Sequence, residues 1–244
     1  MESKFHLPLC ILSSVSRRDY RKADYLTRAI AFNAFYRKTS NISYNQVWSI
    51  IDRYTGGLGY KKDIIEEYMI IQAGCTIAWP EAVEPGSRIL EIGTGLGRTL
   101  FCILESVNVK EYYTIDISAE ILSIALYRNP FKYFQEKLWR DEVYVINYDA
   151  VKLAYILDRN NEKYNHIIHD GGPNPRRNKR IFSKQFFKIL HRLLKDKGTI
   201  SVFAGRNPNE VSRIYRILSE LGFRVYTTSF PRSPVRVIHG YKIG

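Results

Sequence analysis

The sequence contains few sulfur atoms and no long apolar run. Its three cysteines, Cys10, Cys75 and Cys102, are odd in number and far apart, so they form neither a disulfide framework nor a metal-binding pattern. The longest apolar stretches, such as MIIQAGCTIAW, are too short and too interrupted to span a bilayer. The start, MESKFHLPLCILSS, lacks the cations and the cleavage site of a signal peptide. We therefore expect a cytoplasmic protein with reduced thiols, no metal site and no membrane segment.

Acidic residues are scarce toward both ends of the chain. The 244 residues carry 37 Lys and Arg against 24 Asp and Glu, a formal net charge of +13. Residues 1–40 have a net charge of +5, residues 41–162 of −5 and residues 163–244 of +13. Because the charge is segregated rather than uniform, it favours a nucleic-acid-binding face.

The residue pattern changes near residue 85. Before that point, apolar spacing predicts helices over 17–38, over 43–51 and from residue 63, with a break at 54–60. From Ser87 onward strand and helix patterns alternate, with strands expected at 87–93, 111–117, 143–149, 164–170, 199–205, 223–230 and 236–243 and helices at 97–107, 119–129, 183–198 and 208–222. This alternation predicts an α/β fold, a Rossmann-like domain over 85–244 with a mostly parallel sheet and an antiparallel edge, preceded by a small helical region over 1–84.

The stretch ILEIGTGLGRT places three glycines where the first predicted strand meets a helix. Gly93, Gly95 and Gly97 would let the backbone approach a ligand, and Asp116 follows at the end of the next strand, where it could accept two ribose hydroxyls. The spacing differs from the Gly-x-Gly-x-x-Gly of dinucleotide sites. Glu91 would repel a pyrophosphate but suits the ammonium group of a methionine, so S-adenosylmethionine fits better than NAD.

Several motifs together resemble the class I S-adenosylmethionine-dependent methyltransferases. They are LEIGTGLG, the strand end TIDI, Asp149-Ala150 in NYDAV and the strand end IIHD. The resemblance implies that Glu91 and the loop from Gly93 through Thr94 and Gly95 to Gly97 line the methionine and ribose. It also implies that Asp116 holds the ribose hydroxyls, that Ile117 lies against adenine, and that Asp149, with Ala150 beside it, meets the adenine amino group.

The chain is also similar to the spermidine synthases, through DAVKLAYI and the segment from YNHIIHD to FSKQFFKILHRLLKDKG. That family carries an Asp-x-x-Asp arrangement for its polyamine, whereas here Asp170 is followed three positions later by Pro173. A closer resemblance, carried by TGLGRT, NPFKYFQEKLW, IIHD and HGYKI, is to archaeal methyltransferases with a spermidine-synthase-like domain. It implies N4-methylation of cytidine in ribosomal RNA. In that group the fourth strand ends in His-Asp-Pro-Pro-Arg; here Gly171-Gly172 replace the prolines.

The chemistry of such a transfer suits Asp170. An exocyclic base nitrogen is a poor nucleophile, and a carboxylate that accepts its N–H localises the lone pair, so catalysis consists mainly of positioning and local electrostatics. Asp170 is the predicted catalytic acceptor, and His169 is predicted to orient the group or accept a proton. The carbonyls of Gly171-Gly172 could contribute.

Cations are expected to hold the RNA that delivers the base. One predicted wall is RRNKR, which contributes Arg176, Arg177, Lys179 and Arg180. A second predicted wall is the N-terminal cluster Arg17, Arg18, Arg21 and Lys22. Two other functions stay open: an aminopropyltransferase or small-molecule transferase of the same fold, and an RNA-binding assembly factor without chemistry.

Overall fold

The structure is a computed structural model that describes residues 6–37, 40–55, 64–172, 174–230 and 233–243. Most of the predicted break at 54–60 lies outside these residues, as does Pro173.

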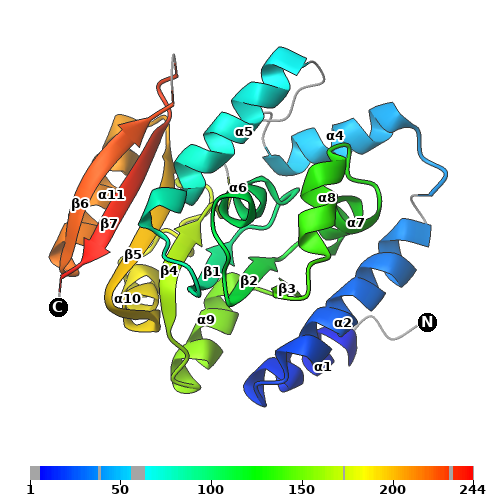
Figure 1. Ribbon diagram of the computed structural model, residues 1–244, viewed down its shortest axis with the longest axis horizontal. Helices are drawn as coiled ribbons and strands as arrows, with labels where there is room; N and C mark the ends of the chain where they lie inside the picture. Colours follow the sequence, from blue (N-terminus) through cyan, green and yellow to red (C-terminus); the bar gives the residue numbers. More distant parts are fainter. Residues whose placement is uncertain (1–5, 38–39, 56–63, 173, 231–232, 244) are drawn as a thin grey trace.

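One seven-stranded mixed sheet organises the chain, in the order β3-β2-β1-β4-β5-β7-β6 (Figure 1). The first five of these strands in space are parallel, and β7 runs antiparallel to both β5 and β6. This confirms the predicted Rossmann-like sheet with an antiparallel edge. The strands are β1 (Arg88–Ile92), β2 (Glu111–Asp116), β3 (Val143–Asn147), β4 (Tyr164–His169), β5 (Leu194–Gly205), β6 (Phe223–Ser229) and β7 (Arg236–Lys242).

Helices cover both faces of this sheet. Successive strand residues point to opposite faces, so Ile89 joins one buried core and Leu90 the other. The first core is covered by α4 (Tyr44–Thr55), α5 (Ile64–Ala78), α6 (Arg98–Ser106), α7 (Ala119–Tyr127) and α8 (Lys132–Leu138), with the short η2 (Pro80–Ala82) leading into β1. The second is covered by α1 (His6–Ser16), α2 (Tyr20–Ile30), α9 (Ala150–Arg159), α10 (Lys184–Leu193) and α11 (Pro208–Glu220). None of the described helices has the length and apolar content to cross a membrane.

The N-terminal helices differ from the single helix predicted over 17–38. A further helix, α1, precedes it, and Arg18 turns the chain with a φ of 60° before Asp19 caps α2. The α2 helix continues into a π-helical turn, η1 (Ala31–Tyr36). The sequence hides α1 because its apolar residues, of which Ile11 and Val15 are fully buried, form a nearly continuous run without helical spacing.

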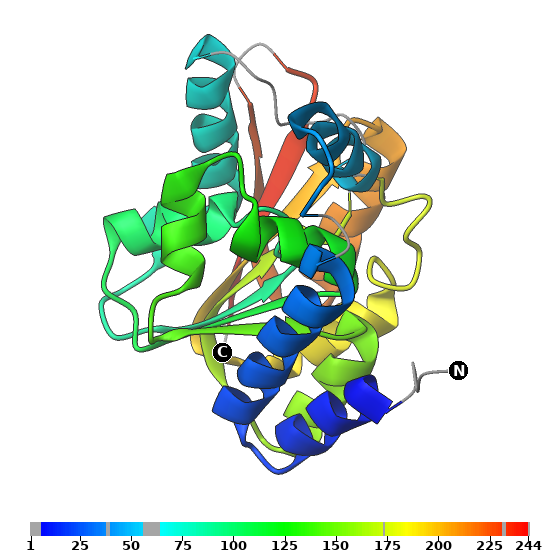
Figure 2. The same ribbon diagram turned by 90° about the vertical axis from the view of Figure 1, so that its right-hand side faces the viewer.

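The α2 helix closes the free edge of β3. Its Asp24 carboxylate accepts a hydrogen bond from the Val145 N–H at 2.8 Å, and the Thr27 hydroxyl accepts one from the Asn147 N–H at 3.0 Å. Figure 2 shows α2 crossing in front of the sheet with α1 beside its lower end. Residues from the region 1–84 therefore share both cores with the rest of the chain.

The helix predicted over 183–198 ends five residues early, at Leu193. Leu194 is extended, fully buried and paired with Tyr164, so it already belongs to β5. Lys197 then adopts a φ of 59°, and a side chain on Gly198 would come within 2.9 Å of the Lys195 carbonyl oxygen. Tertiary pairing and this tight turn override the helical pattern of the sequence.

Candidate functional site

A cavity of about 700 Å³ opens at the carboxyl ends of β1, β2 and β4. Side chains and backbone from each predicted cofactor motif line it, together with the loop that follows β4 and the end of α4. In open parallel sheets, ligands bind at this end of the strands. In the described part of the chain, no group of three or more His, Cys, Asp or Glu is arranged to hold a metal ion.

The glycine loop after β1 has the backbone conformation that its composition predicts. Gly93, Gly95 and Gly97 have φ angles of 97°, 52° and 89°, in a region that side chains disfavour. A Cβ atom on Gly93 would lie 2.4 Å from the Asp170 carbonyl oxygen, so this position has no room for a side chain. Gly93 thus lets the loop and the end of β4 touch. Gly93, Thr94 and Gly95 line the cavity; Gly97 instead packs against Leu138.

Glu91 lies beneath this loop and not in the cavity. Its carboxyl group is fully buried and accepts hydrogen bonds from the hydroxyls of Thr99 and Thr114. Thr114 is in turn 2.7 Å from the Thr94 hydroxyl in the loop. Burial raises the pKa of Glu91 to about 8, so the carboxyl is protonated at neutral pH. This placement replaces the predicted contact between Glu91 and the methionine ammonium: the residue supports the loop from below.

Asp116 and Ile117 form the wall at the end of β2. The Asp116 carboxylate accepts hydrogen bonds from Gly95 N–H at 3.1 Å and Ser118 N–H at 2.9 Å, which fixes it at the cavity wall. Burial raises the pKa of Asp116, while the backbone N–H groups around it oppose that shift. Ile117 is 72% exposed and lines the cavity, so its apolar side chain is accessible to a ligand. Asp116 can accept hydrogen bonds from a ribose, and Ile117 offers an apolar surface to the ring face of a base beside it.

Asp149 and Ala150 form the next part of the wall, after β3. Asp149 caps α9 by accepting a hydrogen bond from Lys152 N–H at 3.0 Å, and its second oxygen pairs with Arg180 Nη1 at 3.1 Å. The predicted adenine end of the site and the cationic loop after β4 therefore meet directly.

Asp170 lies at the other end of the cavity and is paired with Arg98. Arg98 Nη2 donates to Asp170 Oδ2 at 3.2 Å, and their side chains are 11% and 16% exposed. Burial raises the pKa of Asp170, and the Arg98 charge opposes this. Sequence reasoning did not assign Arg98 a role, although it follows Gly97 directly at the first position of α6.

His169 does not reach the cavity. Its ring is fully buried among Phe182, Phe186 and Phe187, and Nε2 donates to the Ile181 carbonyl at 2.8 Å. Burial lowers the pKa of His169 to about 4, so the ring is neutral. Since strand residues alternate, Asp170 faces the cavity while its neighbour faces α10. The predicted proton-handling role of His169 is thus replaced by a structural one: it ties down the end of the loop that carries RRNKR.

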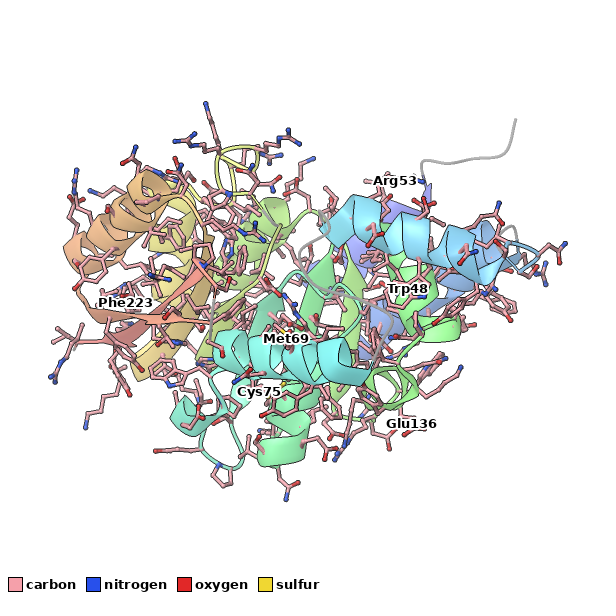
Figure 3. All side chains as sticks on the ribbon, turned by 90° about the horizontal axis from the view of Figure 1, so that it is seen from above. Trp48, Arg53, Met69, Cys75, Glu136 and Phe223 are labelled. Atoms are coloured by element: carbon pink, nitrogen blue, oxygen red, sulfur yellow. The ribbon has the colours of Figure 1, made fainter. Side chains whose placement is uncertain are left out.

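The cations predicted to flank Asp170 do lie at the mouth of the cavity. We call Arg176, Arg177, Lys179 and Arg180 the rim cluster; all four line the cavity and are exposed. Arg177 and Lys179 have no acidic partner among the described residues, whereas Arg180 pairs with Asp149. Arg53 and Tyr54, at the end of α4, line the same cavity from another side. Figure 3 shows Arg53 at the end of this helix. The sequence predicted the helix but gave no signal that its end covers the site.

The N-terminal cations lie elsewhere. We call Arg17, Arg18, Arg21 and Lys22 the turn cluster, because they surround the α1–α2 turn. Arg18 donates to the carbonyl of Asn160 and lies 3.8 Å from Glu162, both of which precede β4. Figure 1 shows this turn at the lower end of the molecule and α4 at the upper end. The structure therefore contradicts the prediction that this cluster forms a second wall of the site, because it lies at the amino ends of the strands.

Comparisons with known proteins agree with this fold. The family model of the Spermine/spermidine synthase domain matches residues 65–229. The spermidine synthase from Thermotoga maritima aligns with a TM-score of 0.58 and 17% identity over 70% of this chain and 60% of that one. A spermidine synthase in complex with the transition state analogue AdoDATO aligns with a TM-score of 0.60 and 18% identity, over 70% of this chain and 61% of that one. A precorrin-6y C5,15-methyltransferase from Geobacter metallireducens GS-15 aligns with a TM-score of 0.53 and 14% identity, over 70% of this chain and 88% of that one.

No curated protein matches the sequence. The aligned part of the chain spans only 60% and 61% of the two spermidine synthases, so these likenesses establish the fold and not the substrate. The family uses S-adenosylmethionine or its decarboxylated derivative. Three findings agree with one another: the family match over residues 65–229, the glycine loop beside strands that end at acidic residues, and the order of the strands in the sheet. The chain belongs to the spermine/spermidine synthase family and has the fold of its S-adenosylmethionine-dependent transferases.

Proposed function

We propose that the protein is an S-adenosylmethionine-dependent methyltransferase that acts on RNA, with an exocyclic amino nitrogen of a base as acceptor. Cytidine N4 in ribosomal RNA is the preferred candidate. The observation that carries the proposal is that a single cavity joins the adenosine-type wall of Asp116, Ile117 and Asp149 to the exposed rim cluster.

The residues present fit such a donor. Asp116 offers carboxylate oxygens to a ribose, Ile117 an apolar surface to a base, and Asp149 an acceptor to an amino group. The absence of a side chain on Gly93 lets the glycine loop pack directly against the end of β4, and Gly93 itself lines the cavity. Bound there, S-adenosylmethionine would supply a methyl group made electrophilic by its sulfonium.

The charge around the cavity supports an anionic acceptor. Among the residues that the structure describes, six cations line it against three acids: Arg53, Arg98, Arg176, Arg177, Lys179 and Arg180 against Asp116, Asp149 and Asp170. Exposed cations at the mouth of a cleft attract phosphates and position a backbone without reading its sequence. Tyr54, also at the mouth, offers a ring on which an unpaired base can stack. A base within a duplex would have to be extruded to reach Asp170.

Asp170 suits the chemistry of transfer to an amine. A carboxylate that accepts the amine N–H localises the nitrogen lone pair; the nitrogen then attacks the methyl carbon as the carbon–sulfur bond breaks. The amine proton passes to Asp170 and then to solvent. Because burial raises the pKa of Asp170, it is a better proton acceptor than an ordinary aspartate. Most of the rate enhancement would come from holding the two reactants in line.

Aminopropyl transfer to a polyamine is the second candidate, and the family match favours it. The charge opposes it: the acid best placed to hold a cationic substrate, Asp170, is already paired with Arg98, and the rim cluster would repel a polyamine.

The test is methyl transfer from tritiated S-adenosylmethionine to total RNA, followed by nucleoside analysis of the labelled product. We expect label in a base-methylated nucleoside, at least a hundredfold less of it with Asp170→Asn, and little change with His169→Gln if that variant folds. Aminopropyl transfer to a polyamine from the decarboxylated donor, without RNA labelling, would overturn the proposal in favour of the second candidate.

A further inference from the structure

Asn178 is an uncharged side chain that lies among the cations of the rim cluster. Its neighbours Arg177 and Lys179 are exposed, whereas Asn178 is half-buried and lines the cavity. Its side-chain amide has no hydrogen-bond partner in the part of the chain that the structure describes. An amide offers two N–H donors and one acceptor oxygen, so Asn178 can form directional hydrogen bonds with a ligand in the cavity.

The amide of Asn178 lies against the turn that directly follows Asp170. In this turn Gly172 has a φ of 93°, and its N–H donates to the Asp170 carbonyl at 3.0 Å. A Cβ atom on Gly172 would lie 2.3 Å from Asn178 Nδ2 and 3.8 Å from Oδ1. The missing side chain thus makes room for the amide, and its donor end faces the turn. Asp170 and Asn178 therefore line the same end of the cavity.

Apolar side chains surround these two polar groups. A Cβ atom on Gly171 would lie 2.9 Å from Ile181 Cδ1 and 3.0 Å from Ile92 Cγ2, so both isoleucines pack against the backbone beside Asp170. Phe203, at 4% exposed, also lines the cavity. Apolar walls with a few polar groups suit a flat ring that carries hydrogen-bonding groups along one edge, as an extruded base does.

The two polar groups are complementary to one kind of base edge. The Asp170 carboxylate accepts a hydrogen bond from an amino group, and Asn178 Nδ2 can donate one to an unprotonated ring nitrogen. Cytosine carries these two groups side by side, as N4 and N3, and adenine carries them as N6 and N1. Uracil presents a carbonyl oxygen and a ring N–H instead, so its oxygen would face the carboxylate.

We propose that Asn178 is a specificity-determining residue that donates a hydrogen bond to the ring nitrogen beside the amino group of the target base. The inference rests on the proposed function and names the base edge that the site accepts. With Asp170 on the amino group and Asn178 on the ring, the base is held at two points. Rotation of the ring in its plane is then restricted, and the amino nitrogen stays in line with the methyl group.

The test compares Asn178→Asp with Asn174→Asp, which makes the same chemical change in the same loop. Asn174 is exposed and is not among the residues that line the cavity. Its side-chain oxygen accepts a hydrogen bond from Arg176 N–H at 3.0 Å, which an aspartate retains. Both variants add one negative charge beside the rim cluster, so they should weaken RNA binding alike in filter-binding assays. The rate is measured as methyl transfer from tritiated S-adenosylmethionine to total RNA at saturating concentrations.

We expect Asn178→Asp to lower the rate by at least about thirtyfold, because a donor is replaced by an oxygen that repels the ring nitrogen. Asn178→Ala, which adds no charge, should lower it about tenfold. Asn174→Asp should stay within about threefold of the wild type. Calorimetry should find S-adenosylmethionine affinity within about threefold of the wild type in all three variants, since the donor end of the cavity is untouched.

Equal rates in Asn178→Asp and Asn174→Asp would overturn the inference and leave the proposed function standing. A loss of S-adenosylmethionine affinity in the Asn178 variants would also overturn it, because the amide would then support the loop and not the acceptor. A wild type that labels no RNA would overturn the proposed function, and the role of Asn178 with it.

Discussion

The rim cluster and the turn cluster have a similar density of cations in the sequence, but they lie at opposite ends of the strands in the folded chain. Each places four cations within six positions. The rim cluster lies at the carboxyl ends of the strands and lines the cavity. The turn cluster lies at the amino ends, where Arg18 contacts Asn160 and Glu162 and the Arg21 guanidinium lies 5.9 Å from the Tyr144 ring centre. In a parallel sheet, the end of the strand at which a cation emerges decides whether it can meet a substrate.

The largest expected difference between the two ends comes from two glycines. Gly93→Ala would press a Cβ atom to 2.4 Å from the Asp170 carbonyl at a φ of 97°, so we expect at least a hundredfold loss of donor affinity by calorimetry. Gly86→Ala is the matched control at the amino end, with a φ of 76° and nothing within 4 Å. It should cost about 1 kcal/mol of stability and leave donor binding intact. Equal losses of donor binding in both variants would contradict the close-approach argument.

Removing three charges from each cluster compares them directly. Arg176→Gln/Arg177→Gln/Lys179→Gln should weaken RNA binding tenfold or more and reduce the slope of log affinity against log salt by about 2, because three phosphate contacts are lost.

Arg17→Gln/Arg21→Gln/Lys22→Gln changes the net charge equally and should alter RNA affinity less than threefold. Filter binding across a salt series measures both slopes. If the two triple variants weaken RNA binding alike, the affinity depends on overall charge and not on the rim.

Mutations at the amino ends of the strands should change the stability of the protein instead of its ligand binding. Glu162 is 8% exposed and accepts hydrogen bonds from Tyr20 at 2.7 Å and Arg88 at 2.9 Å. Glu162→Gln breaks a nearly buried ion pair and should lower the free energy of unfolding by about 3 kcal/mol in urea titrations. Asp149→Asn, whose partner Arg180 is exposed, should cost less than about 1 kcal/mol and weaken donor binding instead. The opposite pattern would contradict the assignment of the site to the carboxyl end.

The last comparison concerns a pH dependence beneath the glycine loop. Glu91 has a pKa raised from 4.5 to about 8, so between these values the folded chain holds a proton that the unfolded chain has lost. Its contribution to stability is complete below pH 4.5 and is lost as the pH rises through about 8. The free energy of unfolding of Glu91→Gln should therefore fall less than that of the wild type as the pH rises across this window, with a difference on the order of a few kcal/mol. Unfolding curves that shift with pH equally in both proteins would contradict the protonated state.

The sequence predicted the sheet because its strands are buried on both faces and read as short apolar runs between helices. It predicted Asp116, Ile117, Asp149 and Asp170 at the cavity, because motif residues at the ends of parallel strands must meet at one edge. It could not predict which strand residues near these positions point away from the cavity. His169 and Glu91 were assigned to the site, but the alternation of side chains along the strands buries both. The role of Arg53 depends on how α4 packs, and the position of the turn cluster depends on α1, which left no periodic signal.

The hydrogen bonds that Asp24 and Thr27 accept from β3 have a consequence for how this protein meets other copies of itself. An unpaired strand edge is a template for adding another strand, and these two side chains occupy N–H groups that a foreign strand would use. Among the described strands, β6 is then the remaining edge of the sheet. A chain shortened past Ile30 would uncover the β3 edge together with the apolar surface that Ala23 and Ile30 bury. Such a truncation would yield a self-associating species, and loss of RNA binding in it would report aggregation.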